Sequence, residues 1–203
     1  PKPEDNPRLR LAIQKARAAN MPNDAIDRAI KKAAGIGGAG KTVQDVVYEG
    51  YGPGGVALVI TAATDNRART AGEVKRIVEH GGGTWGSPGC VSWQFQDRAV
   101  FLAADTTEDA VMEALLEAGA DAQDIQANDD GQVEVSAAPN QFDAVLKALE
   151  SAGIKVLESD LTKIPDNPVD VPPGEALDAL QDLIAELEEN EDVSDVYHNG
   201  VFG

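Results

Sequence analysis

Residues 98–118, RAVFLAADTTEDAVMEALLEA, begin the part of the chain that decides the fold. The apolar run at 98–104 predicts a strand, and apolar residues three and four apart predict a helix at 107–118. A strand, a second strand, a helix and a final strand follow, at 122–127, 131–137, 140–152 and 154–161. The predicted order is therefore β-α-β-β-α-β, which is the ferredoxin-like arrangement.

The segments on both sides of this unit predict further strands and helices. Before it, the patterns indicate a strand at 55–63, a helix at 66–80 and a strand at 90–96. After it come a proline-rich extended connection at 163–174, an acidic amphipathic helix and a last strand around 192–199. Neither piece alone makes a sheet with covered faces, but the two together do.

We therefore expect an α+β fold of three domains. A discontinuous α+β domain comprises residues 42–97 and 162–203, and the ferredoxin-like domain, 98–161, is inserted into it. Residues 1–41 predict an N-terminal helical domain, because Pro7 and Pro22 suit the first positions of two amphipathic helices. Its last residues, GIGGAGK, are typical of a flexible linker.

Charge is distributed unevenly along the chain. The whole chain carries 17 basic and 35 acidic residues, a net charge of −18. Residues 1–41 carry nine basic and four acidic residues, so the remaining 162 residues have a net charge of −23. Because salt screens exposed charges beyond about 8–10 Å, a basic helical segment can bind phosphate beside an acidic body. The alternative is that the acidic surface serves only solubility.

Two further features indicate the cellular compartment. The single cysteine, Cys90, excludes an internal disulfide and fits a reducing compartment. The chain has no signal peptide and no apolar stretch near the roughly 18 residues of a membrane span. We therefore expect a cytoplasmic protein without membrane association.

The stretch YEGYGPGGVALVI, residues 48–60, contains the pattern G-x-G-x-x-G at Gly50, Gly52 and Gly55. In a dinucleotide-binding protein the glycines follow a strand and open a helix, whereas here they lead into a strand. Lys-Ser/Thr, which a P-loop requires after its last glycine, is also missing. We interpret the loop as a tight turn whose glycines adopt positive φ.

No residues stand out as catalytic, cofactor-binding or metal-binding. His80, His198 and Cys90 lack metal-ligand spacing, and no G-x-S-x-G nucleophile motif occurs. We therefore expect neither an enzyme nor a cofactor.

The stretch TDNRARTAGEVKRI, residues 64–77, breaks a local rule. It begins a helix with Asp65 or Asn66 as cap and places Arg67 and Arg69 in the first turn, where the helix dipole is already positive. A bound phosphate would compensate this cost, and removing both arginines would then not destabilise the fold. The alternative is that an acid of the chain, such as Glu73, pairs with them.

The candidate nucleic-acid-binding residues are the basic side chains of these predicted helices. They are Arg8, Arg10, Lys15, Arg17, Arg28, Lys31, Lys32, Arg67, Arg69, Lys75 and Arg76.

Several stretches together resemble the YebC family, which comprises proteins named as probable transcriptional regulators and includes the mitochondrial translational activator of cytochrome c oxidase. They are NPRLRLAIQKARAANMP, AIKKA, YEGYGPGGVALVI, TDNRARTAGEVKRI, GGGTWGSPGCVSWQF and the terminal VYHN. The resemblance covers nearly the whole chain. It implies three domains, a cytosolic or mitochondrial nucleic-acid-associated regulator without catalytic residues, and a further basic leader before Pro1.

The leading hypothesis is therefore a nonenzymatic, monomeric regulator of gene expression, with DNA-binding transcription regulation as its first form. RNA binding at the ribosome, as a translation factor, is the alternative form, because phosphate contacts do not read sequence. Ferredoxin-like domains also bind metabolites, so a small-molecule sensor is the rival hypothesis from another class.

Overall fold

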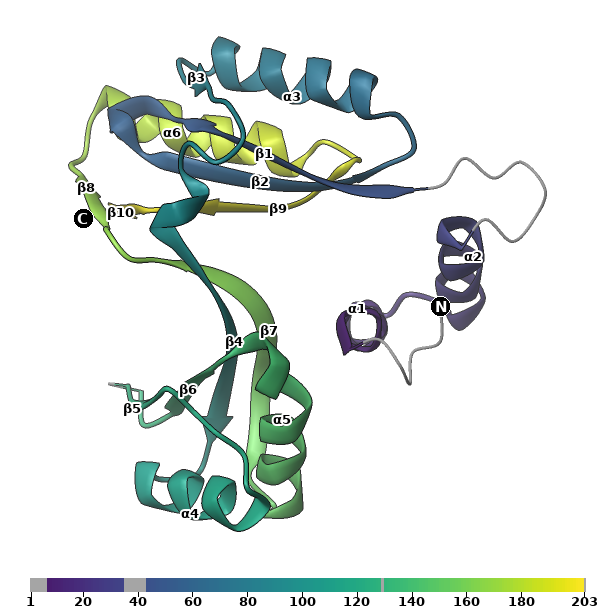
Figure 1. The fold of residues 1–203 in the computed structure, drawn as a ribbon, viewed down its shortest axis with the longest axis vertical. Helices are drawn as coiled ribbons and strands as arrows, with labels where there is room; N and C mark the ends of the chain where they lie inside the picture. Colours follow the sequence, from purple (N-terminus) through teal and green to yellow (C-terminus); the bar gives the residue numbers. More distant parts are fainter. Residues whose placement is uncertain (1–6, 35–42, 129, 203) are drawn as a thin grey trace. The chain divides into compact units, whose positions relative to one another are not determined.

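The computed structural model describes residues 7–34, 43–128 and 130–202 (Figure 1). Its contacts divide the chain into two compact units. The first unit contains Pro1–Arg28 and Asp97–Lys163, and the second contains Ala29–Gln96 and Ile164–Gly203. Both units are discontinuous in sequence, and the division into three domains with these boundaries stays a prediction.

The first unit contains the predicted ferredoxin-like arrangement. Its elements are β4 (Phe95–Ala104), α4 (Glu108–Ala118), β5 (Asp124–Ala127), β6 (Val133–Ala137), α5 (Phe142–Ser151) and β7 (Lys155–Pro165). The sheet has the order β5-β6-β4-β7, so each β-α-β crossover leaves room for one strand between its two strands. The six predicted elements are all present, with boundaries that differ by a few residues.

The core of the first unit lies between one face of this sheet and the two helices α4 and α5. Alternate residues of β4 point into it, so that Ala99, Phe101 and Ala103 are fully buried. Phe101 lies opposite Val135 of β6 and packs its ring 5.1 Å from that of Phe142. Helix α4 begins where the Thr107 side chain accepts a hydrogen bond from the Ala110 N–H.

The second unit is built on another four-stranded sheet. Its elements are β1 (Gln44–Tyr51), β2 (Ala57–Thr64), α3 (Arg67–His80), β3 (Thr84–Trp85), α6 (Glu175–Glu188) and β9 (Val193–His198). The strand order is β3-β1-β2-β9, and α3 and α6 cover the same face (Figure 1). β8 (Val169–Val171) and β10 (Gly200–Phe202) form a separate parallel pair.

β2 lies at the centre of this sheet and is buried on both faces. Leu58 and Ile60 pack against α3 and α6, whereas Ala57 and Val59 face the other way and pack against Val91. All five side chains have zero exposure. The second face of β2 is therefore covered by the segment that carries Val91 and not by a helix.

The sequence interpretation was wrong for residues 90–96 and overlooked β1. Residues 92–94 form a short 3-10 helix, and the strand begins only at Phe95. The cause is Glu49 of β1, whose carboxylate accepts hydrogen bonds from the backbone N–H groups of Gly89, Val91 and Ser92 at 2.7, 2.9 and 2.8 Å. These N–H groups cannot also pair in a sheet, so the segment folds as a loop.

The glycine-rich loop between β1 and β2 has the predicted role. Pro53–Gly55 form a single 3-10 turn, and Gly54 and Gly55 adopt φ of 74° and 75°. Side chains rarely adopt these angles, which explains the glycines at both positions.

Two helices precede the first sheet in sequence, α1 (Pro7–Ala18) and α2 (Asn23–Ala33). Ile26 is the buried anchor of α2, with 5% exposure. The predicted linker at 35–41 lies outside the described residues. The separation of residues 1–41 as a domain of their own stays a prediction.

We predict that Glu49→Ala destabilises the second unit by about 3 kcal/mol, because it leaves three partly buried N–H groups without a partner. Urea unfolding followed by circular dichroism measures this loss. Glu186→Ala, which removes an exposed acid from α6, is the control and should change stability by less than about 0.5 kcal/mol. Equal stabilities of the two variants would contradict this role of Glu49.

Candidate nucleic-acid interface

The first turn of α3 is held by side chains on both sides of it. Asn66 is the cap, as predicted, and its side chain accepts a hydrogen bond from the Arg69 N–H at 3.2 Å. The Asn66 N–H in turn donates to the Thr64 hydroxyl at 2.9 Å. The end of β2 and the start of α3 are thereby joined without any ligand.

The charge of Arg69 is balanced by an acid from the distant end of the chain. Its guanidinium donates to the Asp192 carboxylate at 2.6 Å, and the Thr70 hydroxyl donates to the same oxygen at 2.6 Å. Thr64 approaches that oxygen at 3.3 Å. Asp192, just before β9, therefore occupies the place that the sequence interpretation gave to a phosphate.

These contacts lower the pKa of Asp192. The Thr70 hydrogen bond is the largest cause; partial burial opposes it, and Arg69 and Thr64 lower the pKa further. Two more acids, Asp65 and Glu73, lie 3.5 and 4.0 Å from the Arg69 guanidinium. Arg69 is thus the centre of an internal ion-pair network, and the alternative of an acidic partner within the chain describes it better than a phosphate.

The other bases of α3 differ from Arg69. Arg67 is exposed and has no ion pair within the described part of the chain. Its backbone carbonyl accepts from the Tyr48 hydroxyl at 3.4 Å. Lys75 lies 3.7 Å from Glu79 one turn along the helix, and Arg76 is exposed. Arg67 and Arg76 are therefore the bases of α3 that are available to a partner.

Two bases of α1 contact acids of the first unit. Arg10 pairs with Asp143 of α5, and Lys15 lies 2.6 Å from Asp160 of β7. Arg17 has only an amide partner, because its Nε donates to the Asn23 side chain at 3.3 Å.

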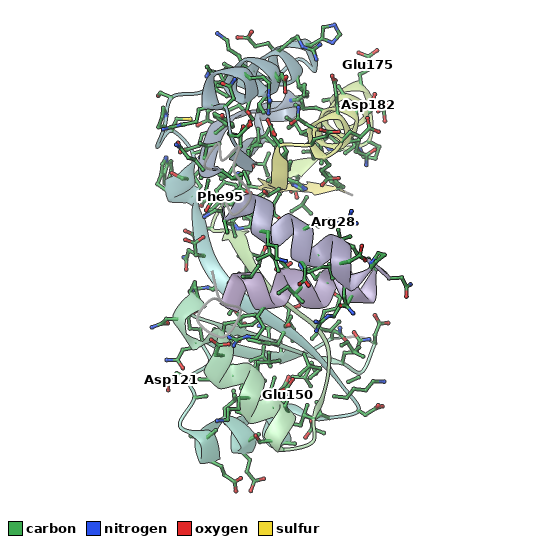
Figure 2. The ribbon with its side chains drawn as sticks, turned by 90° about the vertical axis from the view of Figure 1, so that its right-hand side faces the viewer. Arg28, Phe95, Asp121, Glu150, Glu175 and Asp182 are labelled. Atoms are coloured by element: carbon green, nitrogen blue, oxygen red, sulfur yellow. The ribbon has the colours of Figure 1, made fainter. Side chains whose placement is uncertain are left out.

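Helix α2 presents its bases to solvent. Arg28 pairs with Asp24 one turn earlier at 3.0 Å, but both side chains remain 75% exposed, and Arg28 projects from the helix (Figure 2). Lys31 is exposed and is unpaired among the residues with described side chains. The side chains of Arg8 and Lys32, two further predicted contacts, lie outside the described residues.

The ion pairs of α1 and α2 are of the exposed kind. Such pairs contribute roughly 0.2–1 kcal/mol each, because water and salt screen them. A phosphate can therefore compete for these cations at low cost. Arg10, Lys15, Arg17 and Arg28 belong to the first unit, whereas Lys31 and the bases of α3 belong to the second.

The described residues offer no other chemical site. Within residues 7–34, 43–128 and 130–202, no group of three His, Cys, Asp or Glu side chains is placed to hold a metal ion. None of the helices described in these ranges is both long and apolar enough to cross a membrane.

Sequence reasoning missed two acids that organise the second unit, Glu49 and Asp192. The sequence gives a weak indication that Glu49 has a structural role, because it is an acid among the alternating residues of a strand. It gives no such indication for Asp192, which lies 123 residues from Arg69 and among many other acids.

Two family models match the chain. One, described as the TACO1/YebC second and third domain, matches residues 43–200. The other, described as the TACO1/YebC protein N-terminal domain, matches residues 1–36.

Related proteins and a solved structure agree with these matches. A "probable transcriptional regulatory protein" of Maridesulfovibrio salexigens is 48% identical over 98% of this chain and 79% of its own length. A second protein of this name, from Desulforamulus reducens, is 43% identical, and the match covers 97% of this chain and 81% of that protein. The crystal structure of a conserved hypothetical protein from Aquifex aeolicus has a TM-score of 0.81 at 36% identity, and the match covers all of this chain and 82% of that one.

The ion-pair network predicts different effects for two arginines in the same helical turn. Arg69→Ala should lower the melting temperature, by roughly 1–3 °C, because it leaves Asp192 without its cation. Arg67→Ala removes an exposed arginine without a described ion pair and should leave the melting temperature unchanged. Differential scanning calorimetry of the two variants measures the difference. Equal melting temperatures would restore the idea that an external anion compensates both arginines.

The lowered pKa of Asp192 predicts a pH-dependent contribution to stability. Its contribution is complete above the unfolded-state pKa of about 3.9 and is lost as pH falls through the lower folded-state pKa. Asp192→Asn should therefore cost about 2 kcal/mol at pH 6 and progressively less as the pH falls below about 4. Urea unfolding at several pH values measures this. A cost that is independent of pH would show that the charge of Asp192 is irrelevant.

Proposed function

The chain belongs to the TACO1/YebC family, and from this premise we propose that it is a nonenzymatic regulator of gene expression that contacts nucleic acid through its N-terminal helices. Its relatives are named as probable transcriptional regulatory proteins. Those names describe regulators and no enzyme class.

The observation that carries this proposal is the concentration of weakly held cations on α1 and α2. Residues 7–34 include seven basic and two acidic residues. Those with described side chains are exposed, or paired only through exposed ion pairs or an amide. Phosphate groups bind such cations with release of counterions, which is the main source of affinity for nucleic acid.

The ferredoxin-like sheet is a poor alternative site. Some sheets of this topology bind RNA by stacking bases on aromatic side chains of their open face. Here the face that points away from α4 and α5 carries Val100 and Leu102 on β4, Glu134 on β6 and Asp124 on β5. These side chains offer no stacking platform. The alternation along β4 also places Arg98 on this face, so the face carries charges of both signs.

Phosphate contacts position a protein on nucleic acid but do not read its sequence. The cations therefore suit DNA and RNA alike. We propose DNA as the first target because the relatives are named as transcriptional regulators, and structured RNA as the second. An A-form helix suits binding through its backbone and shape, so a role in translation fits the same cations. The cytoplasm is the compartment that we propose for either role.

We predict that removing the least restrained cations weakens binding in a salt-dependent manner. For the triple variant Arg17→Ala, Arg28→Ala, Lys31→Ala, the slope of log K against log salt should fall by about 2 to 3, since each phosphate contact contributes about 0.9 on duplex DNA. Fluorescence anisotropy with a labelled duplex DNA and a labelled RNA hairpin, between 50 and 300 mM salt, measures the slope and the preference.

The matched control is Lys147→Ala, Lys155→Ala, which removes two exposed bases from the ferredoxin-like part of the first unit. This variant should keep the slope of the unmodified chain. A triple variant that binds like the unmodified chain, or no dependence on salt, would refute the role of the N-terminal helices.

A further inference from the structure

The loop that follows β3 is held rigidly over the face of the second sheet that α3 and α6 leave free. The carboxylate of Glu49, which has 7% exposure, accepts the three hydrogen bonds from Gly89, Val91 and Ser92. Burial raises the pKa of Glu49, but the backbone hydrogen bonds outweigh it, so the pKa lies below its usual value. The carboxylate is therefore ionised at neutral pH, and it fixes the loop.

Trp93 stands on this fixed loop with its ring in solvent. Val91 of the loop and Phe95, the first residue of β4, pack toward β2. Trp93 itself is 68% exposed, and its indole N–H donates to the carbonyl of Cys90 at 3.0 Å. An exposed tryptophan of fixed orientation has little conformational entropy to lose on binding, which is typical of interface anchors.

Two more exposed side chains lie on the same face of the sheet. Val47 and Tyr51 stand two residues before and after Glu49 on β1, so they point to the same side as Glu49. Their exposed fractions are 50% and 37%. We call Val47, Tyr51 and Trp93 together the aromatic face.

The aromatic face has acids beside it and no base among residues 43–96 and 164–202. Val47 lies opposite Thr61, and the Thr61 hydroxyl contacts the Asp195 carboxylate at 3.2 Å, which places Asp195 on this side. Asp45, two residues before Val47, also points this way. The bases within residues 43–96 and 164–202 are all on α3, which packs against the opposite face of the sheet.

We propose that the aromatic face is a docking site for an arginine-bearing segment of a protein partner. Guanidinium groups are attracted to the faces of tryptophan and tyrosine rings, and Asp45 and Asp195 add complementary charge. The phosphates of nucleic acid would meet two acids here, and no base from residues 43–96 or 164–202. The site therefore differs from the proposed nucleic-acid interface both in its residues and in the charge of its partner.

The test follows the two indole N–H signals, of Trp85 and Trp93, in ¹⁵N NMR spectra of the full chain. The probes are a ten-residue peptide of alternating arginine and serine, the same peptide with lysine, and a twelve-residue oligothymidylate. The Trp93 signal should shift most with the arginine peptide, whereas the Trp85 signal should stay in place. A Trp93 signal that moves with the oligothymidylate and not with the arginine peptide would overturn the proposal in favour of nucleic acid.

Variants separate this site from the general acidity of the protein. Trp93→Ala should weaken binding of the arginine peptide at least fivefold at 150 mM salt, and Trp93→Phe should restore most of it. Leu116→Ala, at an apolar side chain of α4 that is 74% exposed, is the control and should bind like the unmodified chain. Equal affinities of the Trp93→Ala and Leu116→Ala variants would show that the peptide binds by charge alone and would refute the site.

Discussion

The second unit depends on the hydrogen bonds that the Glu49 carboxylate accepts from three backbone N–H groups. A carboxylate that is nearly buried must have its oxygens satisfied, and here the partners come from a loop about 40 residues further along the chain. The same three bonds keep the loop out of any sheet, close the second face of β2 over Ala57 and Val59, and leave Trp93 outside. One buried charge thus fixes where β4 begins, the small apolar cluster of Ala57, Val59 and Val91, and the position of an exposed aromatic ring.

Asp192 has a comparable role at the other end of the sheet. It joins the segment before β9 to the end of β2 and the first turn of α3, through Arg69, Thr70 and Thr64. Acids with such internal roles are not part of the solvated surface. Other acids are solvated, as on α6, where Glu175 and Asp182 project into solvent (Figure 2). The net charge of −18 therefore combines a few structural carboxylates with a larger exposed population, and only the exposed population sets how the protein meets charged partners.

The limits of sequence reasoning follow from the range of these interactions. The β-α-β-β-α-β unit could be predicted because its helices and strands are specified by local periodicity, as in the alternation of Ala99, Phe101 and Ala103. The segment at 90–96 also has strand-like composition, but the carboxylate that prevents a strand there is remote. Arg67 and Arg69 look equivalent in sequence, and only the position of Asp192 distinguishes them. The bases of α1 and α2 could be found from composition alone, whereas the aromatic face could not, because exposure of Trp93 depends on the Glu49 contact.

The distribution of charge has a consequence for how such a regulator can work. Cations on α1 and α2 favour phosphate, while the aromatic face, with Asp45 and Asp195 beside it, disfavours phosphate and favours guanidinium. A polyanion is therefore directed away from the aromatic face by the same charges that make this face attractive to a basic protein. Because exposed charges act over only about 8–10 Å in physiological salt, each surface selects its partner through the charges that lie on it. If both proposed surfaces bind as argued, the chain connects a nucleic acid to a protein.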